Sequence, residues 1–183
     1  MTLPPPAASP TATSPLDTGA FGAIRRNHGL EHATIHLLSR KLAATPGRMR
    51  YLAGISHPGG FFLLGDLPSA DIETAANDAL TRLRNGENAL AIHPNCGTNL
   101  LTSATLAAIA GLLMFGGMRS RSELSWRFPN AITAIVLALI IAQPLGLLLQ
   151  RDITTSANVG EMQVLKVAPV LSGPVVIHHV TTG

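Results

Sequence analysis

Two long apolar stretches limit the folds open to this chain of 183 residues. Residues 98–117 and 130–149 contain no charged side chain, and each has about the ~20 residues that an α-helix needs to cross a bilayer. A buried pair of helices in a soluble protein would keep a polar face, and neither stretch has one. We therefore expect a transmembrane helical hairpin over residues 98–149.

The composition supports contact with lipid and argues against contact with nucleic acid. Hydrophobic residues make up 46% of the chain and charged residues only 13%, which is apolar for a chain of this size. The net charge is +3, but the lysines and arginines form no basic stripe with interleaved aromatic residues. We therefore expect the lipid bilayer as a partner and no nucleic acid.

The remaining residues predict a small α+β domain over residues 16–97. Apolar periodicity and turn residues give the order helix, strand, strand, helix, strand over residues 14–44, 50–55, 61–64, 69–85 and 89–92. Residues 150–183 hold two more alternating segments, and we expect these to return to the domain and complete its sheet. Residues 1–15 contain five prolines and predict a disordered tail.

The run from Asn27 to His36 holds the first candidate site. His28, Glu31 and His32 have the order His-x-x-Glu-His, which places all three side chains on one face of a helix. In inverted zincins this order supplies two histidine ligands to zinc and a glutamate that polarises the metal-bound water. This pattern therefore predicts His28 and His32 as metal ligands and Glu31 as the catalytic residue.

Other roles stay open for two residues of this run. Glu31 is alternatively a metal ligand itself, or the partner of Arg25 or Arg26 in a salt bridge. His36 either extends the site or lies on a solvated flank of the helix.

A second run, His93-Pro-Asn-Cys96-Gly-Thr, lies directly before the first apolar stretch. Cys96 is the only cysteine, so it cannot form an internal disulfide. With His93 beside it, we take both residues as further metal ligands. Such ligands favour zinc, with iron as the runner-up. Four protein ligands would close the site and make it structural, whereas three would leave a position for water.

The two runs carry a resemblance. His-Gly-x-Glu-His at 28–32 followed by His-Pro-x-Cys-Gly-Thr at 93–98 resembles a family of predicted metal-dependent, multi-pass bacterial membrane enzymes. The overall layout is closer to a two-pass bacterial membrane protein family that is a domain of unknown function. The resemblance implies a metal site at the bacterial cytoplasmic (inner) membrane, and neither family brings a reaction.

The orientation in that membrane follows from opposing signals. Three arginines in the linker between the apolar stretches favour a cytoplasmic linker. The N-terminus, however, does not read as a signal peptide, and a free cysteine suits a reducing compartment. We expect both termini in the cytoplasm.

Two functions fit these observations. The first is a zinc-dependent hydrolase that acts on a membrane-protein segment or a lipid-linked group, with Glu31 as the base. The alternative is a non-catalytic membrane scaffold, or interaction module, in which a closed structural zinc site holds the domain together. The sequence favours the hydrolase, because a catalytic role explains a central glutamate better than a purely structural site does. The oligomeric state stays open.

Overall fold

The computed structural model describes residues 14–44, 51–171, 173 and 176–183. The chain forms two compact units. The sheet unit consists of Met1–Ile92 and Ile153–Gly183, and the hairpin unit of His93–Asp152.

The helix α1 (Gly19–Ala43) carries the His-x-x-Glu-His run in the sheet unit. It follows a short 3-10 turn, Pro15–Asp17, in which the Ser14 hydroxyl accepts a hydrogen bond from the Leu16 backbone N–H. The predicted helix start at Ser14 therefore caps this turn, and the long helix begins later because Thr18 is extended. Pro46-Gly47, a helix-breaking pair that predicts the end of this helix, lies outside the described residues.

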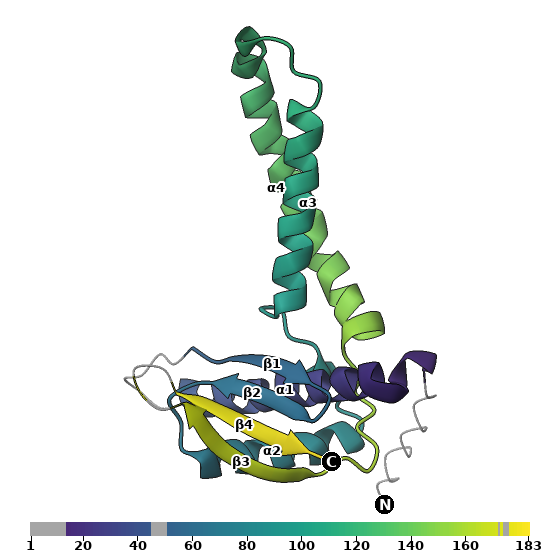
Figure 1. Ribbon diagram of the computed structural model, residues 1–183, viewed down its shortest axis with the longest axis vertical. Coiled ribbons are helices and arrows are strands. Elements are labelled where there is room, and N and C mark those ends of the chain that lie inside the picture. Colours follow the sequence, from purple (N-terminus) through teal and green to yellow (C-terminus); the bar gives the residue numbers. More distant parts are fainter. Residues whose placement is uncertain (1–13, 45–50, 172, 174–175) are drawn as a thin grey trace, which may run out of the picture. The chain divides into compact units, whose positions relative to one another are not determined.

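The sheet has four antiparallel strands in the order β1-β2-β4-β3. Their bounds are Ala53–His57 for β1, Gly60–Leu64 for β2, Val164–Leu171 for β3 and Ile177–Thr182 for β4. The predicted return of the C-terminal segment to the sheet is confirmed, because β4 pairs directly with β2 (Figure 1).

The predicted third strand at residues 89–92 is wrong. Residues Asn88–Ala91 form a 3-10 helix, and the consecutive residues Leu90 and Ala91 are both buried. A strand with one buried face would bury only alternate residues. The position beside β2 is taken instead by β4, which comes from the other end of the chain.

One face of the sheet packs against α1 and α2 (Ser69–Arg84), both behind the sheet in Figure 1. Phe61, Leu63 and Val180 from the strands are fully buried in this core. The sequence predicts Ser69 as the cap of α2 and Asn85-Gly86 as its stop. The stop is confirmed, whereas the N-cap is Pro68 rather than Ser69. The other face of the sheet is open, and Ile55 on it is 74% exposed.

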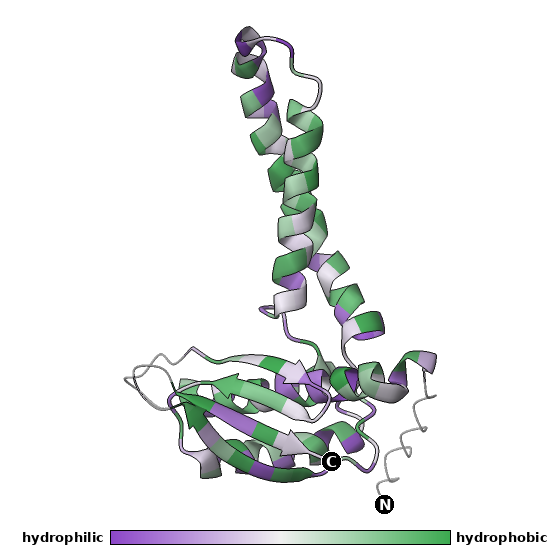
Figure 2. Cartoon of the chain, viewed as in Figure 1, coloured by the Kyte–Doolittle hydropathy of each residue, from purple (hydrophilic) through white to green (hydrophobic). Residues whose placement is uncertain are grey.

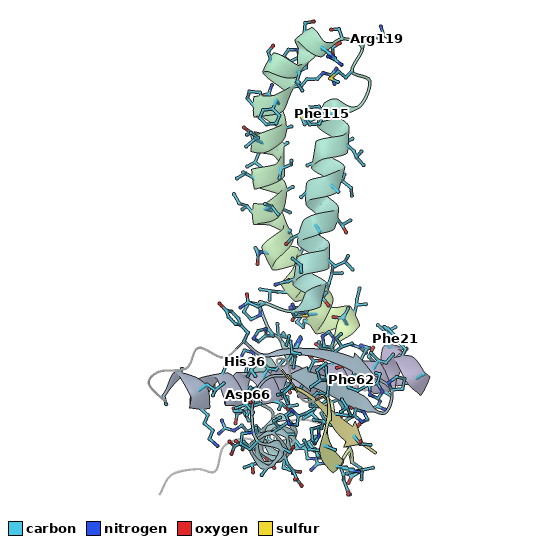
Figure 3. All side chains as sticks on the ribbon, turned by 60° about the vertical axis from the view of Figure 1, so that its left-hand side comes forward. Phe21, His36, Phe62, Asp66, Phe115 and Arg119 are labelled. Carbon is cyan, nitrogen blue, oxygen red and sulfur yellow. The ribbon has the colours of Figure 1, made fainter. Side chains whose placement is uncertain are left out.

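The hairpin unit consists of α3 (Gly97–Phe115) and α4 (Leu124–Leu149). Both helices are long and apolar enough to cross a membrane, and Figure 2 shows the apolar colour along them. The Arg127 guanidinium donates hydrogen bonds to the carbonyls of Met114 and Gly116 and thereby caps the end of α3. Phe115 and Arg119, labelled in Figure 3, mark this end of the hairpin.

Candidate metal centre

His28 and His32 lie one turn apart on α1, as the sequence predicts. Their ring centroids are 4.3 Å apart and their planes meet at 63°. His32 is buried and His28 is half-buried, so the pair sits at the edge of the core rather than on a solvated face. Two imidazoles this close can serve one metal ion, since each needs to reach only about 2 Å from it.

Backbone carbonyls fix the hydrogen positions of both rings. His28 Nδ1 lies 2.9 Å from the Thr154 carbonyl oxygen, and His32 Nδ1 lies 2.8 Å from that of Ala91. A carbonyl oxygen only accepts hydrogen bonds, so the hydrogen of each neutral ring is on Nδ1 and the lone pair is on Nε2. Metal-binding histidines characteristically donate the other ring N–H in this way, which orients the ring and raises its basicity.

Cys96, the predicted cysteine ligand, belongs to the hairpin unit, whereas His28 and His32 belong to the sheet unit. That these three residues share one metal ion stays a prediction. In the hairpin unit, Cys96 caps the N-terminus of α3, and its Sγ accepts a hydrogen bond from the Thr98 backbone N–H at 3.2 Å. Donation to sulfur favours the thiolate, which is the form that binds metals.

Glu31 is buried on the side of α1 that meets β1. The Ser56 hydroxyl donates a hydrogen bond of 2.5 Å to its carboxylate. A Cβ at Gly54 would lie 2.4 Å from Glu31 Oε1, so only glycine leaves room for the carboxylate there. Arg25 and Arg26, the alternative partners of Glu31, both contact Asp17. Arg25 forms an ion pair with the Asp17 carboxylate, and Arg26 donates a hydrogen bond to the Asp17 backbone carbonyl.

Gly29, the glycine of the His-Gly-x-Glu-His run, has a structural role. A Cβ at this position would lie 2.2 Å from the Ser156 carbonyl oxygen. The Ser156 N–H donates to the Arg25 carbonyl, so the segment after α4 runs tightly against α1. Because this segment also supplies the Thr154 carbonyl to His28, Gly29 permits the approach that orients the ring.

The remaining candidate histidines are held differently. His36 Nε2 donates to the Ile92 carbonyl at 2.9 Å, next to the Ala91 carbonyl that accepts from His32. His93 Nδ1 accepts a hydrogen bond from the Asn95 N–H, which places the hydrogen of its neutral ring on Nε2. This is the opposite tautomer to that of His28 and His32, and His93 as a ligand stays a prediction.

The family of this chain follows from its sequence. Residues 23–167 match the family described as Domain of unknown function (DUF6391). The chain belongs to this family. It is 39% identical over 140 residues to an uncharacterised protein of Picosynechococcus sp., an alignment that covers 73% of this chain and 66% of that protein. The chain thus spans just under two thirds of this relative's length. No solved structure matches significantly.

The family match contains every candidate site residue, from His28 to Cys96. Membership of a family of unknown function is therefore confirmed. The resemblance of the two motifs to metal-dependent membrane enzymes stays a prediction, and so does the membrane nature of the family.

Four contributors to the site were missed by sequence reasoning. Gly54 was predicted only as part of a strand and Ser56 only as the residue after it, although a glycine and a small hydroxyl on the inward face of β1 leave room for a polar group. The carbonyls of Ala91 and Thr154 leave no mark in the sequence, because every residue has one.

Proposed function

We propose that this chain is a membrane-anchored, metal-dependent hydrolase. In this proposal His28, His32 and Cys96 hold the metal and Glu31 accepts a proton from the attacking water. The observation that carries the proposal is the pair of Nδ1–H donations to backbone carbonyls, which directs the Nε2 lone pairs of two neighbouring histidines for metal binding.

The number of ligands favours catalysis over a purely structural site. Catalytic zinc sites have three protein ligands drawn from histidine, cysteine and carboxylate side chains, and keep the fourth position for water or substrate. Zinc in such a site lowers the pKa of bound water to about 7. His93 would close the site as a fourth ligand, so the open, catalytic site proposed here has three protein ligands and excludes His93.

The surroundings of Glu31 suit a general base. Its carboxylate is buried and is held in one orientation by the Ser56 hydroxyl and the space above Gly54. A base must be held within reach of the proton that it abstracts, and a carboxylate with fixed geometry is prepared for that task. It also directly precedes a proposed ligand in the order of the inverted zincins.

A substrate in or at the bilayer is supported by the chain itself. Cys96 directly precedes α3, one of two helices that are long and apolar enough to cross a membrane. Only 11% of each apolar window is buried, whereas the core helix of a soluble protein would be mostly buried. We therefore propose a membrane-protein segment or a lipid-linked group as substrate, at the bacterial inner membrane with both termini in the cytoplasm.

Cobalt substitution tests this proposal without a known substrate. The full chain, purified in detergent, is stripped of metal and loaded with Co²⁺, whose visible spectrum reports its coordination. Loss of the thiolate-to-cobalt charge-transfer band in Cys96→Ser, with cobalt still bound, would support Cys96 as ligand. An open site also changes its spectrum when azide is added, because the anion enters the fourth position.

Glu31→Gln separates the two functions that the sequence leaves open. If Glu31 is a base, the variant binds cobalt as the wild type does, but the pH at which the spectrum changes is shifted. A spectrum that responds neither to azide nor to pH in the wild type would mean a closed site, and would replace the hydrolase by the structural zinc module.

A further inference from the structure

A second pair of histidines meets on the open face of the sheet, away from the α1 site. His57 ends β1 and His179 lies in β4, so the strand β2 runs between them. Their Nε2 atoms are 2.9 Å apart and their ring centroids 5.0 Å apart, with the planes at 24°. We propose that His57 and His179 bind a divalent cation of the copper or nickel type through these two Nε2 atoms.

The sheet is built so that the two rings can meet. Strands that are two apart are separated by roughly 9–10 Å, so side chains on them touch only by reaching across the middle strand. His57 pairs with Gly60, which has no side chain in the way, and Gly60 in turn pairs with Thr181. A Cβ at Gly60 would lie 2.0 Å from the Val180 carbonyl oxygen.

Phe62 packs against the rings of His57 and His179 and fixes their orientation. This residue of β2, labelled in Figure 3, pairs with His179, and its ring lies 4.8 Å from that of His179 and 5.2 Å from that of His57. Both histidines are half-buried, so they are ordered by packing and still reach solvent. Ligands that are held in place before binding lose little freedom when the metal arrives.

The separation of the nitrogens selects the type of metal. With bonds of about 2.0–2.1 Å, neighbouring ligands in a square-planar site are about 2.9 Å apart, against about 3.3 Å in a tetrahedral site. The 2.9 Å between the two hydrogen-bonded Nε2 atoms is close to this square-planar separation, so Cu²⁺ and Ni²⁺, which prefer that geometry, need little movement of the rings. Water would fill the other positions, since the outer-face residues paired with this pair across the described strands include no carboxylate.

Metal binding requires a change in the hydrogen bonds of His57 and His179. Gly59 N–H donates to His57 Nδ1, so the hydrogen of that ring is on Nε2 and is donated to His179 Nε2. On metal binding this hydrogen moves through solvent to His57 Nδ1, which then no longer accepts from the exposed Gly59 N–H, and both rings stay neutral. Burial, and after it the nearby His57, lower the pKa of His179, which keeps that ring neutral and able to bind.

Copper titration of the full chain in detergent tests this inference independently of the α1 site. In a His28→Ala/His32→Ala/Cys96→Ala background, we expect one Cu²⁺ whose electron paramagnetic resonance spectrum shows two coupled imidazole nitrogens. His57→Gln and His179→Gln should each weaken binding at least ~10-fold, because one imidazole cannot chelate. His36→Gln, which removes a histidine from α1, should leave the affinity unchanged.

A second form of the experiment guards against loss of folding in the triple variant. Wild-type chain loaded with zinc is titrated with Cu²⁺, and the sheet-face ion is recognised by its two-nitrogen spectrum and by its loss in His57→Gln. The inference is overturned if no two-nitrogen copper signal forms, or if it persists in both His57→Gln and His179→Gln. The pair would then be a hydrogen-bonded link between β1 and β4.

Discussion

Gly54→Ala should displace Glu31 while leaving the metal ligands in place. The new Cβ would lie 2.4, 2.5 and 2.7 Å from the Oε1, Cδ and Cγ atoms of Glu31, closer than such atoms can approach. Glu31 is 97% buried behind β1, so its carboxylate has little space to move aside. The substitution therefore separates the carboxylate from Ser56, which now donates to it at 2.5 Å.

The magnitude follows from two opposing contributions. Loss of a hydrogen bond to a charged group costs roughly 1.5–3 kcal/mol. Replacing glycine by alanine restricts the unfolded chain and stabilises the fold by about 0.4–1 kcal/mol where the backbone allows it. We therefore expect the free energy of unfolding of the sheet unit to fall by about 1–2 kcal/mol, which is a factor of about 5–30 in the unfolded fraction.

Hydrogen–deuterium exchange of β1 and β2 amides in the full chain measures this change directly. Exchange should accelerate about 5–30-fold in Gly54→Ala, whereas zinc stays bound. The matched control is Gly59→Ala in the same hairpin, where the nearest atoms to a new Cβ are at an ordinary 3.5 Å. Equal exchange rates in Gly54→Ala and the wild type would refute the close packing of Glu31 on Gly54.

Two further predictions concern the hairpin and the pH dependence. In the hairpin unit, Gly146→Ala would place a methyl group 1.8 Å from Asn99 Oδ1, so the midpoint of thermal unfolding in detergent should fall. Gly111→Ala is the control, because its nearest atom is at 3.9 Å and the midpoint should stay unchanged. Equal midpoints for the two variants would contradict the contact between Gly146 and Asn99. Burial lowers the pKa of His178 and of His179 below the ordinary value of about 6.5, so the unfolded chain takes up protons first and the sheet unit should lose stability as the pH falls from about 7 towards 5. Unchanged exchange protection of β4 over this range would contradict that burial.

The local elements could be predicted because their patterns are local. Apolar periodicity and turn residues place α1, β1, β2 and α2 within five residues of their observed bounds. The segment at 89–92 misled because a short apolar run fits a strand as well as a 3-10 turn. The choice between strand and 3-10 turn depends on which segment pairs with β2. That segment is β4, whose residues are more than a hundred positions away in the sequence.

The sequence predicts the types of ligand in the candidate site, but not the groups that orient them. The spacing of His28 and His32 identifies the pair, and their burial is what an apolar helix face implies. Their hydrogen positions depend on the Ala91 and Thr154 carbonyls, which tertiary structure alone brings to the rings. For the same reason the sequence gives no sign that His57 and His179 meet across β2.

The metal content of the chain, purified in detergent and measured by elemental mass spectrometry, tests the central claim most directly. We predict about one zinc per chain in the wild type and in Glu31→Gln, and its loss in His28→Ala and His32→Ala, since one site is shared by both rings. A wild-type chain without metal, or a metal content that neither histidine substitution changes, would contradict the account.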